Sequence, residues 1–528
     1  MTLVSKVEKM RRSIARTAVI LLMTLAVVAI CSSLARSQTA TPQTVSSTTD
    51  ESASDSLKKL DLLIEQNSQL EKQNKELMDQ IASLRRVLAK QAGTEAETSA
   101  PDSEQGEEPN ATANLTSEKQ PDKWGAYTPN LGYKVANTDR GDLSISIYTY
   151  ARYLNQLGLD QTFTNALGNV TTLQRRQDFQ LNKLQIKFLG WILNPKFRYF
   201  LYAWSSNASQ GLGAQVVLAG NLSYAFNKYF TVGAGIRSLP GTRSVEGNFP
   251  FWLGVDTRLI ADEFFRPSYT SGVWASGKIT DRLDYIAMIG NNLSTLGVSA
   301  AQLNNGFNTV STSLVWQPSA SKFGLGFGDF EDHQELASRL GAHFTRSDED
   351  RQEQPNSDQF ENTQIRLEDG TVVFTPNLFG PGISVNDLTY KMAAFDGGLK
   401  YHGFSLEGEY FLRWLDHFHG PGTAVIAPIF SHGFQLQTSA MVLPKTLQVY
   451  LGGSLLTGNA AVLDAYRAKY GNPWDFRAGL NYFPYHNKVL RWNNEFLYLY
   501  RSPVGYTSVP FALGGTGPIF ASTLELAF

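Results

Sequence analysis

The chain has one cysteine, little charge and a single long hydrophobic run in 528 residues. Charged residues account for 18% of it and the formal net charge is −2, which argues against a protein that binds nucleic-acid phosphates. A helical membrane protein shows several apolar runs of about 20 residues, whereas here the one run lies near the N-terminus. The 44 glycines, 22 tyrosines and 12% aromatic residues suit a large β-protein with aromatic girdles.

Residues 1–35 have the parts of a secretory signal peptide. A basic region precedes the apolar stretch Thr17–Ile30, and Ser33-Leu34-Ala35 supplies small residues for cleavage. The alternative, a membrane anchor, needs about 20 apolar residues, and this stretch has 14. A lipoprotein signal would place a small residue before Cys31, where Ile30 stands. We therefore expect cleavage to remove Cys31, leaving no thiol for a disulfide, a nucleophile or a thiolate metal site.

A heptad pattern over residues 55–91 predicts an α-helical coiled coil, which follows a linker at 36–54 that we expect to be disordered. Asparagine at two a positions fixes the register and favours dimers in parallel coils. An amphipathic helix that packs on its own domain is the alternative. Residues 92–138 are acidic and read as a flexible linker. The residues expected in the core of the coil are Leu60, Leu63, Asn67, Leu70, Asn74, Leu77, Ile81, Leu84 and Leu88.

From residue 139 to 528 the pattern changes to amphipathic strands. The clearest is 404–415, where Phe, Leu, Tyr and Trp alternate with Ser, Glu and Arg. A soluble sandwich would also alternate, but its strands average about 5–6 residues, whereas tilted membrane strands need about 9–11. The predicted fold class is therefore an all-β transmembrane antiparallel barrel of about 16 strands. Its strands are expected to start near 142, 175, 196, 214, 229, 269, 281, 308, 335, 386, 402, 432, 445, 473, 487 and 518.

The predicted connections alternate between short turns and long loops, as outer-membrane barrels require. The link 318–334 is the exception, because it is long where a short turn is expected. The last strand carries Leu524, Leu526 and Phe528 on one face, and this face is expected to contact lipid while Glu525 points inward. An amphipathic strand that ends on an aromatic residue resembles the signal that the barrel-assembly machinery reads.

Catalytic and metal motifs are not apparent in the sequence. The Gly-rich segment 324–328 has no phosphate-binding lysine after it, so a turn is expected there. His417 and His419 stand beside Asp416, but no further ligands follow at defined spacing, and a solvated loop is expected. Residues 327–332 lack the spacing of a calcium loop. We therefore expect no enzyme, no metal and no cofactor.

Inward-facing cations are the candidate pore-lining residues of such a barrel. Three of them belong to segment 239–268, which follows the fifth strand and whose aromatic residues could pack it against the wall. Almost as many acidic residues share the inner face. The alternative for each arginine is an ion pair that stabilises the wall or an exposed charge at the rim. The candidates are Lys183, Lys187, Arg237, Arg243, Arg258, Arg266, Arg413, Arg477 and Arg491.

The strand and loop rhythm, the segment Phe264-Phe265-Arg266-Pro267-Ser268-Tyr269-Thr270-Ser271-Gly272 and the terminal Phe528 resemble the phosphate-selective porin O and P family. The resemblance implies a third outer loop folded into the lumen, a homotrimer, and passage of small anions such as phosphate. Family members concentrate cations in the lumen, and here acids are mixed in, so phosphate selectivity does not carry over directly.

The sequence thus predicts an outer-membrane porin for passive diffusion of small hydrophilic solutes, with its N-terminal segment in the periplasm. The alternative is a structural anchor whose coiled coil binds peptidoglycan or a periplasmic partner. Neither reading involves nucleic acid.

Overall fold

The computed structural model describes residues 127–128, 132–165, 168–205, 216–245, 250–296, 298–299, 301–303, 306–354, 364–458, 472–505 and 509–528. The chain divides into two units, Met1–Glu107 and Glu108–Phe528, and every described residue belongs to the second. The predicted signal peptide, the first linker, the coiled coil and most of the second linker lie outside the described residues. In the described part of the chain, no helix combines the length and apolar character needed to cross a membrane.

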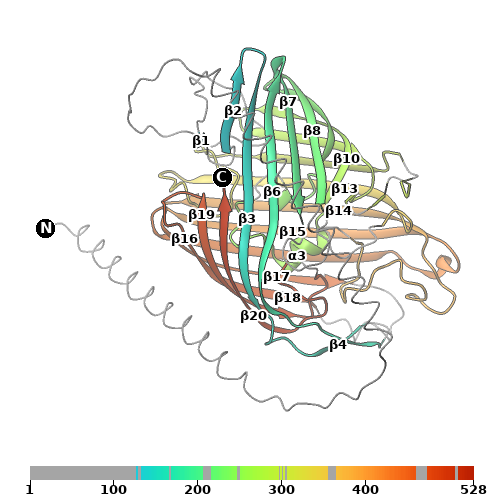
Figure 1. Cartoon of the computed structure of the whole chain (residues 1–528). Helices are drawn as coiled ribbons and strands as arrows, with labels where there is room; N and C mark the ends of the chain where they lie inside the picture. Colours follow the sequence, from blue (N-terminus) through green and yellow to red (C-terminus); the bar gives the residue numbers. More distant parts are fainter. Residues whose placement is uncertain are drawn as a thin grey trace, which may run out of the picture. The chain divides into compact units, whose positions relative to one another are not determined.

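Sixteen antiparallel strands form one closed sheet, because the last strand pairs with the first (Figure 1). The sixteen-strand barrel expected from the sequence is therefore confirmed, and each expected strand start lies within a few residues of an observed one. The strands are β3 (Gly141–Asn155), β6 (Gln177–Ile192), β7 (Asn194–Ser205), β8 (Val216–Asn227), β9 (Phe230–Ser238), β10 (Tyr269–Thr280), β11 (Leu283–Gly290), β12 (Thr309–Trp316), β13 (Ala337–Asp350), β14 (Asp387–Tyr401), β15 (Phe404–His419), β16 (Ile429–Leu443), β17 (Leu447–Gly458), β18 (Trp474–Tyr482), β19 (Leu490–Tyr500) and β20 (Gly517–Ala527).

The two faces of these strands differ as the sequence predicts. In β15, Glu407, Glu409 and Arg413 are buried inside the barrel, whereas Phe404 and Tyr410 are exposed on its outer surface. In β20, Leu524 is 51% exposed and Glu525 is 3% exposed. The outer surface is therefore apolar and the inner wall is polar, which is the arrangement of a barrel in lipid.

The barrel has a short-turn end and a long-loop end. Strand β3 begins and strand β20 ends at the short-turn end. Both ends of the barrel therefore lie there, as an even number of strands requires. One connection at this end, residues 317–336 between β12 and β13, is long, and we call it the inner insertion. At the long-loop end, the segment 156–176 carries a small hairpin of β4 (Thr162–Thr164) and β5 (Val170–Thr172).

The end of the predicted second linker is β-structure instead of a flexible segment. Gly132–Thr138 forms strand β2, and Tyr127–Thr128 forms β1, which pairs with β2. The reason lies in the length of β20. Phe528 makes backbone hydrogen bonds with Ile147, which leaves the first residues of β3 without a partner from β20. Strand β2 pairs with β3 at that point, and Tyr133 packs edge-on against Phe528. Strands β20 and β2 together therefore pair with β3 and close the barrel.

The long-loop half of the barrel contains an apolar core rather than open space. Inward-facing Tyr390, Phe411 and Leu499 of the wall are buried against residues of the inserted loops. Segment 364–386 contributes Leu367, Val373 and Phe379, among others, and segment 501–516 contributes Val504 and Phe511.

The lipid-facing assignment makes a direct prediction at Leu436, which is 51% exposed near the middle of β16. Leu436→Arg is expected to destabilise the folded barrel by about 2–4 kcal/mol, because a cation then faces hydrocarbon. Leu436→Ala is the matched control and should cost much less. Urea unfolding in phospholipid vesicles measures both, and equal stability of the two variants would contradict the orientation.

Candidate functional site

The described residues of segment 239–268, which are 239–245 and 250–268 and are here called the lumen loop, lie inside the barrel and contain the helices η1 (Arg243–Val245) and α3 (Ile260–Phe265). Wall side chains donate hydrogen bonds to the backbone carbonyls of its middle part. Arg152 contacts the Val255 oxygen at 2.8 Å, Arg491 the Trp252 oxygen at 2.6 Å, and Arg477 the Thr257 oxygen at 3.1 Å. Asn481 donates to the Leu253 oxygen at 2.9 Å. These donors from β3, β18 and β19 hold the lumen loop against one side of the wall.

Asp256 provides a charged anchor for the same loop. Its carboxylate lies 2.6 Å from the Lys183 ammonium and accepts a 2.9 Å hydrogen bond from the Tyr150 hydroxyl. Lys183 sits at a β-bulge with a positive φ of 52°, so that Asn182 and Lys183 both point inward. The bulge brings the ammonium to the loop.

The end of the lumen loop, which includes α3, packs on the neighbouring part of the wall, against β14 to β18. Phe265 stacks on Phe411 with ring centroids 5.2 Å apart, and Tyr390 donates to the Phe265 oxygen at 2.8 Å. Glu263 bridges Arg258, at 2.9 Å, and Arg266, at 2.7 Å. Burial raises the pKa of Asp262, and Arg258 opposes this shift without cancelling it.

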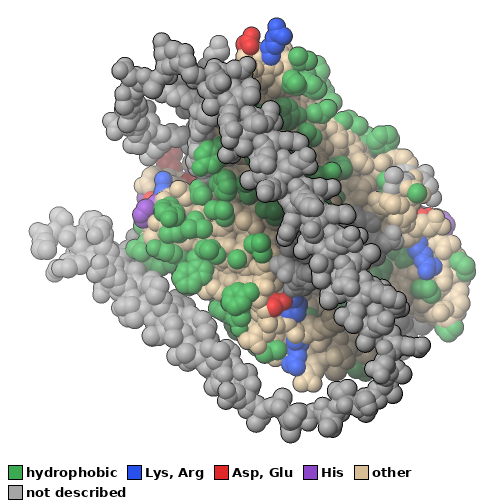
Figure 2. Space-filling view, in the orientation of Figure 1, with side chains coloured by type: hydrophobic (Ala, Val, Ile, Leu, Met, Phe, Trp, Pro, Cys, Tyr) green, Lys and Arg blue, Asp and Glu red, His purple; other side chains and the backbone are tan. Residues whose placement is uncertain are grey.

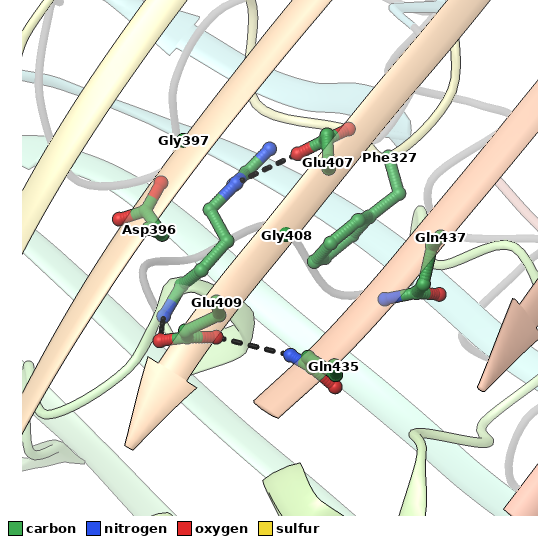
Figure 3. Close-up of a pocket in the computed structure, with 9 residues that line it drawn as sticks. Phe327, Asp396, Gly397, Glu407, Gly408, Glu409, Gln435 and Gln437 are labelled. Atoms are coloured by element: carbon green, nitrogen blue, oxygen red, sulfur yellow. Dashed lines mark hydrogen bonds and ion pairs between the residues drawn. The ribbon is translucent and has the colours of Figure 1, made fainter. Parts of the chain in front are cut away.

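Arg243 of the lumen loop reaches the wall at β15. Its Nε lies 3.1 Å from Glu407, and its backbone N–H donates to Glu409 at 2.9 Å (Figure 3). A terminal nitrogen donates to the Leu325 oxygen of the inner insertion at 2.8 Å. The guanidinium also lies over the ring of Phe327, 4.6 Å from its centroid. Arg243 thus joins the wall, the lumen loop and the inner insertion.

The inner insertion enters the interior from the short-turn end and meets the lumen loop. Its Phe327 N–H donates to the Phe251 oxygen at 2.9 Å, and Phe327 packs with Trp252, Leu253 and Tyr450. Lys400 of β14 donates to the Gly326 oxygen at 2.6 Å. Two segments that enter from opposite ends therefore touch inside the barrel.

Asp329, Glu331 and His333 fasten the inner insertion, and their ligand atoms lie within 4.8 Å of one another. The hydrogen bond from His333 to Asp329 is the main cause of the raised pKa of His333. Burial would raise the pKa of Glu331, but the nearby Lys488 and Lys400 outweigh it and lower the pKa to about 2. Both ring nitrogens of His333 are engaged, with Asp329 and the Lys322 oxygen, and Glu331 pairs with Lys488 at 2.6 Å. We therefore assign the group a structural role.

The opposite wall, along β8 to β11, is less covered. The inward residues Asn221 and Ser223 of β8 are only partly buried. Lys278 and Asp284, which form a 3.0 Å ion pair between β10 and β11, keep 21% and 31% of their side-chain surface exposed. The partly exposed polar residues of β8 and of the β10 and β11 ends near their turn are the water-accessible part of this wall, whereas Trp274 and Met288 further along β10 and β11 are buried.

All nine cations chosen from the sequence lie on the inner wall or in the lumen loop, but most of them are in ion pairs. Arg413 lies 3.8 Å from Glu368, Arg477 lies 3.4 Å from Glu495, and Arg491 pairs with Glu525. Arg237 differs, because it stacks on Trp274 at 5.0 Å and has no carboxylate within ion-pair distance among the described residues. Lys187 is buried on β6, four residues after Lys183.

Several cations that hold the loops or join wall strands are not among the nine candidates. Arg152 follows the inward alternation of β3 beyond Thr149, so extending the pattern would have found it. Arg339 makes a bidentate contact with Asp396, at 2.7 and 3.0 Å, and Lys400 holds the inner insertion. Only the fold shows these partners. Among the buried described residues, carboxylates outnumber lysines and arginines by fourteen to eleven.

The outer surface carries an aromatic band at each end of the strands. Tyr229, Trp316 and Tyr401 are exposed near the short-turn end. Near the long-loop end, Trp414 packs on Phe430 and Trp474 stacks on Tyr498. Hydrophobic side chains cover much of the described outer face between them (Figure 2). A closed sixteen-strand barrel with an apolar belt, aromatic girdles and a polar interior is a porin-like channel fold of the bacterial outer membrane.

Comparisons with solved structures return barrels of this class. OmpT of Vibrio cholerae aligns at a TM-score of 0.45 and 10% identity over 74% of this chain and 99% of its own. The anion-selective porin from Comamonas acidovorans aligns at 0.42 and 10%, over 74% and 100% of the two chains. The channel DcaP of Acinetobacter baumannii aligns at 0.46 and 8%, over 74% and 99%. No protein-family model and no curated protein matches the chain. The barrel assignment rests on the strand register and the two faces of the strands.

Proposed function

We propose that this protein is an outer-membrane channel through which small hydrophilic solutes diffuse passively, along the polar wall formed by β8 to β11. The observation that carries the proposal is the partial exposure of inward polar residues on this wall, including Ser223 and the Lys278–Asp284 pair. The lumen loop and the inner insertion occupy the opposite side and narrow the path. Channels of this kind are not enzymes.

The charges in the interior favour a weak preference for cations. At least seven of the nine candidate cations contact carboxylates of described residues, and several also donate to loop carbonyls. A phosphate ladder of the kind that the family resemblance implies needs cations that are available to the solute. The excess of buried carboxylates supports the opposite preference. Reversal potentials in asymmetric KCl measure it, and a strong anion preference would contradict this part of the proposal.

Introduced cysteines test whether the solute path runs along the wall formed by β8 to β11. The mature chain is expected to be free of thiols, so a single introduced cysteine reports on its own position. Ser223→Cys is expected to react with a charged methanethiosulfonate reagent and to lower the conductance. Ser439→Cys is the control, because Ser439 is inward but 2% exposed and bonded to Ser405. Equal reaction of the two variants would rule out the proposed path.

The alternative function, an anchor, is favoured by the apolar core in the long-loop half of the barrel. In this reading the predicted coiled coil binds peptidoglycan or a periplasmic partner. Deleting residues 56–91 separates the two functions. Loss of envelope attachment with unchanged conductance would make the coil a tether added to a channel.

We also infer that the chain assembles as a homotrimer, that the barrel-assembly machinery reads its last strand, and that the short-turn end faces the periplasm. The expected cleavage of the signal and the position of both ends of the barrel at the short-turn end support this orientation. Native mass spectrometry in detergent tests the trimer, and a monomer at all detergent-to-protein ratios would exclude it.

A further inference from the structure

A small cavity lies where Arg243 meets the wall, between strands β14, β15 and β16 (Figure 3). The paired residues Glu407 and Gln437, and Glu409 and Gln435, form a patch of oxygen-bearing side chains on the inner face of β15 and β16. Phe327 of the inner insertion closes one side of it. The lining therefore combines carboxylates, amides and an aromatic ring, which are the groups that recognise an organic cation.

Arg243 occupies this site with its own side chain. The guanidinium receives all three kinds of contact that such a ligand needs: an ion pair with Glu407 at 3.1 Å, the carbonyl of Leu325 at 2.8 Å, and the face of Phe327 at 4.6 Å. Phe323 adds a second ring at 5.9 Å. Arg243 is 2% exposed, so these contacts are sheltered from water.

The site has more acceptor oxygen atoms than Arg243 uses. Glu407 is 5% exposed and its Oε1 accepts no hydrogen bond from any described residue, and the Oε1 of Gln435, which is 4% exposed, accepts none either. The remaining cavity volume is about 10 Å³, which is near the minimum for one water molecule. A larger ligand can therefore enter only when Arg243 leaves.

We propose that the patch of Glu407, Glu409, Gln435 and Phe327 is a binding site for organic cations with a guanidinium or primary ammonium group, and that Arg243 is its tethered occupant. This proposal rests on the proposed channel function. The site lies at the contact between the lumen loop and the inner insertion, which narrow the solute path. A cationic solute that displaces Arg243 breaks the contacts of Arg243 with both the wall and the inner insertion. Binding is therefore coupled to the width of the path.

The experiment uses the full-length chain in planar bilayers, with guanidinium chloride as the probe at millimolar concentration. Urea, which is planar and of similar size but uncharged, is the matched control. Arg243→Ala vacates the site, which opens a second gap in the lumen, and guanidinium that refills this gap is expected to block part of the variant's current while urea does not. Adding Glu407→Gln should weaken the block about tenfold or more, since a hydrogen bond to a charged group is lost. Arg258→Ala removes another arginine of the lumen loop and should not create a block.

A second readout does not depend on conduction. Guanidinium at the same concentration is expected to raise the unfolding temperature of detergent-solubilised Arg243→Ala and to leave Arg243→Ala/Glu407→Gln unchanged. Arg243→Gln replaces Arg243→Ala if the alanine variant does not fold. Equal effects of guanidinium and urea on Arg243→Ala in both assays, or a block that persists without Glu407, would overturn the site. Absence of current from every variant, with the thermal effect intact, would instead contradict only the channel function.

Discussion

Replacing residues 322–334 with a short Gly/Ser linker is expected to raise the single-channel conductance severalfold. This segment contains Phe323, Phe327 and Asp329, which are buried inside the barrel and contact the lumen loop or the wall. The ends of the deletion lie close together, because Ser321 forms a β-bridge with Ala337. The linker therefore closes the turn without pulling on β12 or β13, and the path widens at the point where the two inserted segments meet.

The control for this deletion is the removal of the exposed Lys228–Asp281 pair, which joins the β8–β9 turn to the β10–β11 turn. Alanine substitutions there lie outside the lumen and should leave the conductance unchanged. Planar-bilayer recordings of the three proteins under the same salt conditions give the comparison. A shortened variant that folds and conducts no better than the parent chain would show that the inner insertion does not limit the path.

The second large effect is expected at Arg491 and Glu525, which form a buried ion pair between β19 and β20. Arg491→Met is expected to destabilise the barrel by about 3–5 kcal/mol, because it leaves a buried carboxylate without its cation. It also removes the hydrogen bond from Arg491 to the Trp252 oxygen, which holds the lumen loop. The double variant Arg491→Met/Glu525→Leu should recover part of the loss, since no unpaired charge remains.

The temperature at which the folded band disappears on semi-native gels measures this pair for the parent chain, both single variants and the double variant. A double variant that is as unstable as the sum of the single variants would show that the two side chains do not act as a pair. In that case the role of Arg491 would be limited to the lumen loop.

The strands were predictable because a lipid-facing wall requires an apolar side chain at every second residue over long segments. Leu524 and Glu525 could be assigned to opposite faces without a structure, and so could Tyr410 and Glu409. The period fails at Lys183, where the bulge turns two successive residues inward. A local change of this kind depends on the partner strand and on Asp256, which lies 73 residues further along the chain.

The inward direction of the cations could be predicted, but their partners could not. Arg243 and Glu407 are 164 residues apart in the sequence, and only the path of the lumen loop brings them together. One of the two alternatives stated for the arginines, an ion pair that stabilises the wall, describes Arg243, Arg413, Arg477 and Arg491. Strand β2 was missed for a related reason, because its role depends on where β20 ends against β3.

The length of the link 318–334 was visible in the sequence, but its position was not. Phe323 and Phe327 make it too apolar for an exposed turn. Inside the barrel, the Lys400 ammonium lies over the Phe323 ring and the Arg243 guanidinium lies over the Phe327 ring. Length and composition together could therefore have indicated an inserted segment. The contact with Phe251 could not have been anticipated, since it joins loops from opposite ends of the barrel.

Single-channel recording of the purified full-length chain in planar bilayers tests the central claim most directly. Stepwise openings of small conductance with a weak cation preference are expected for the parent chain, and larger steps for the variant that lacks residues 322–334. Silent bilayers for both proteins, with folded barrel verified in the same membranes, would contradict the channel and favour the anchor.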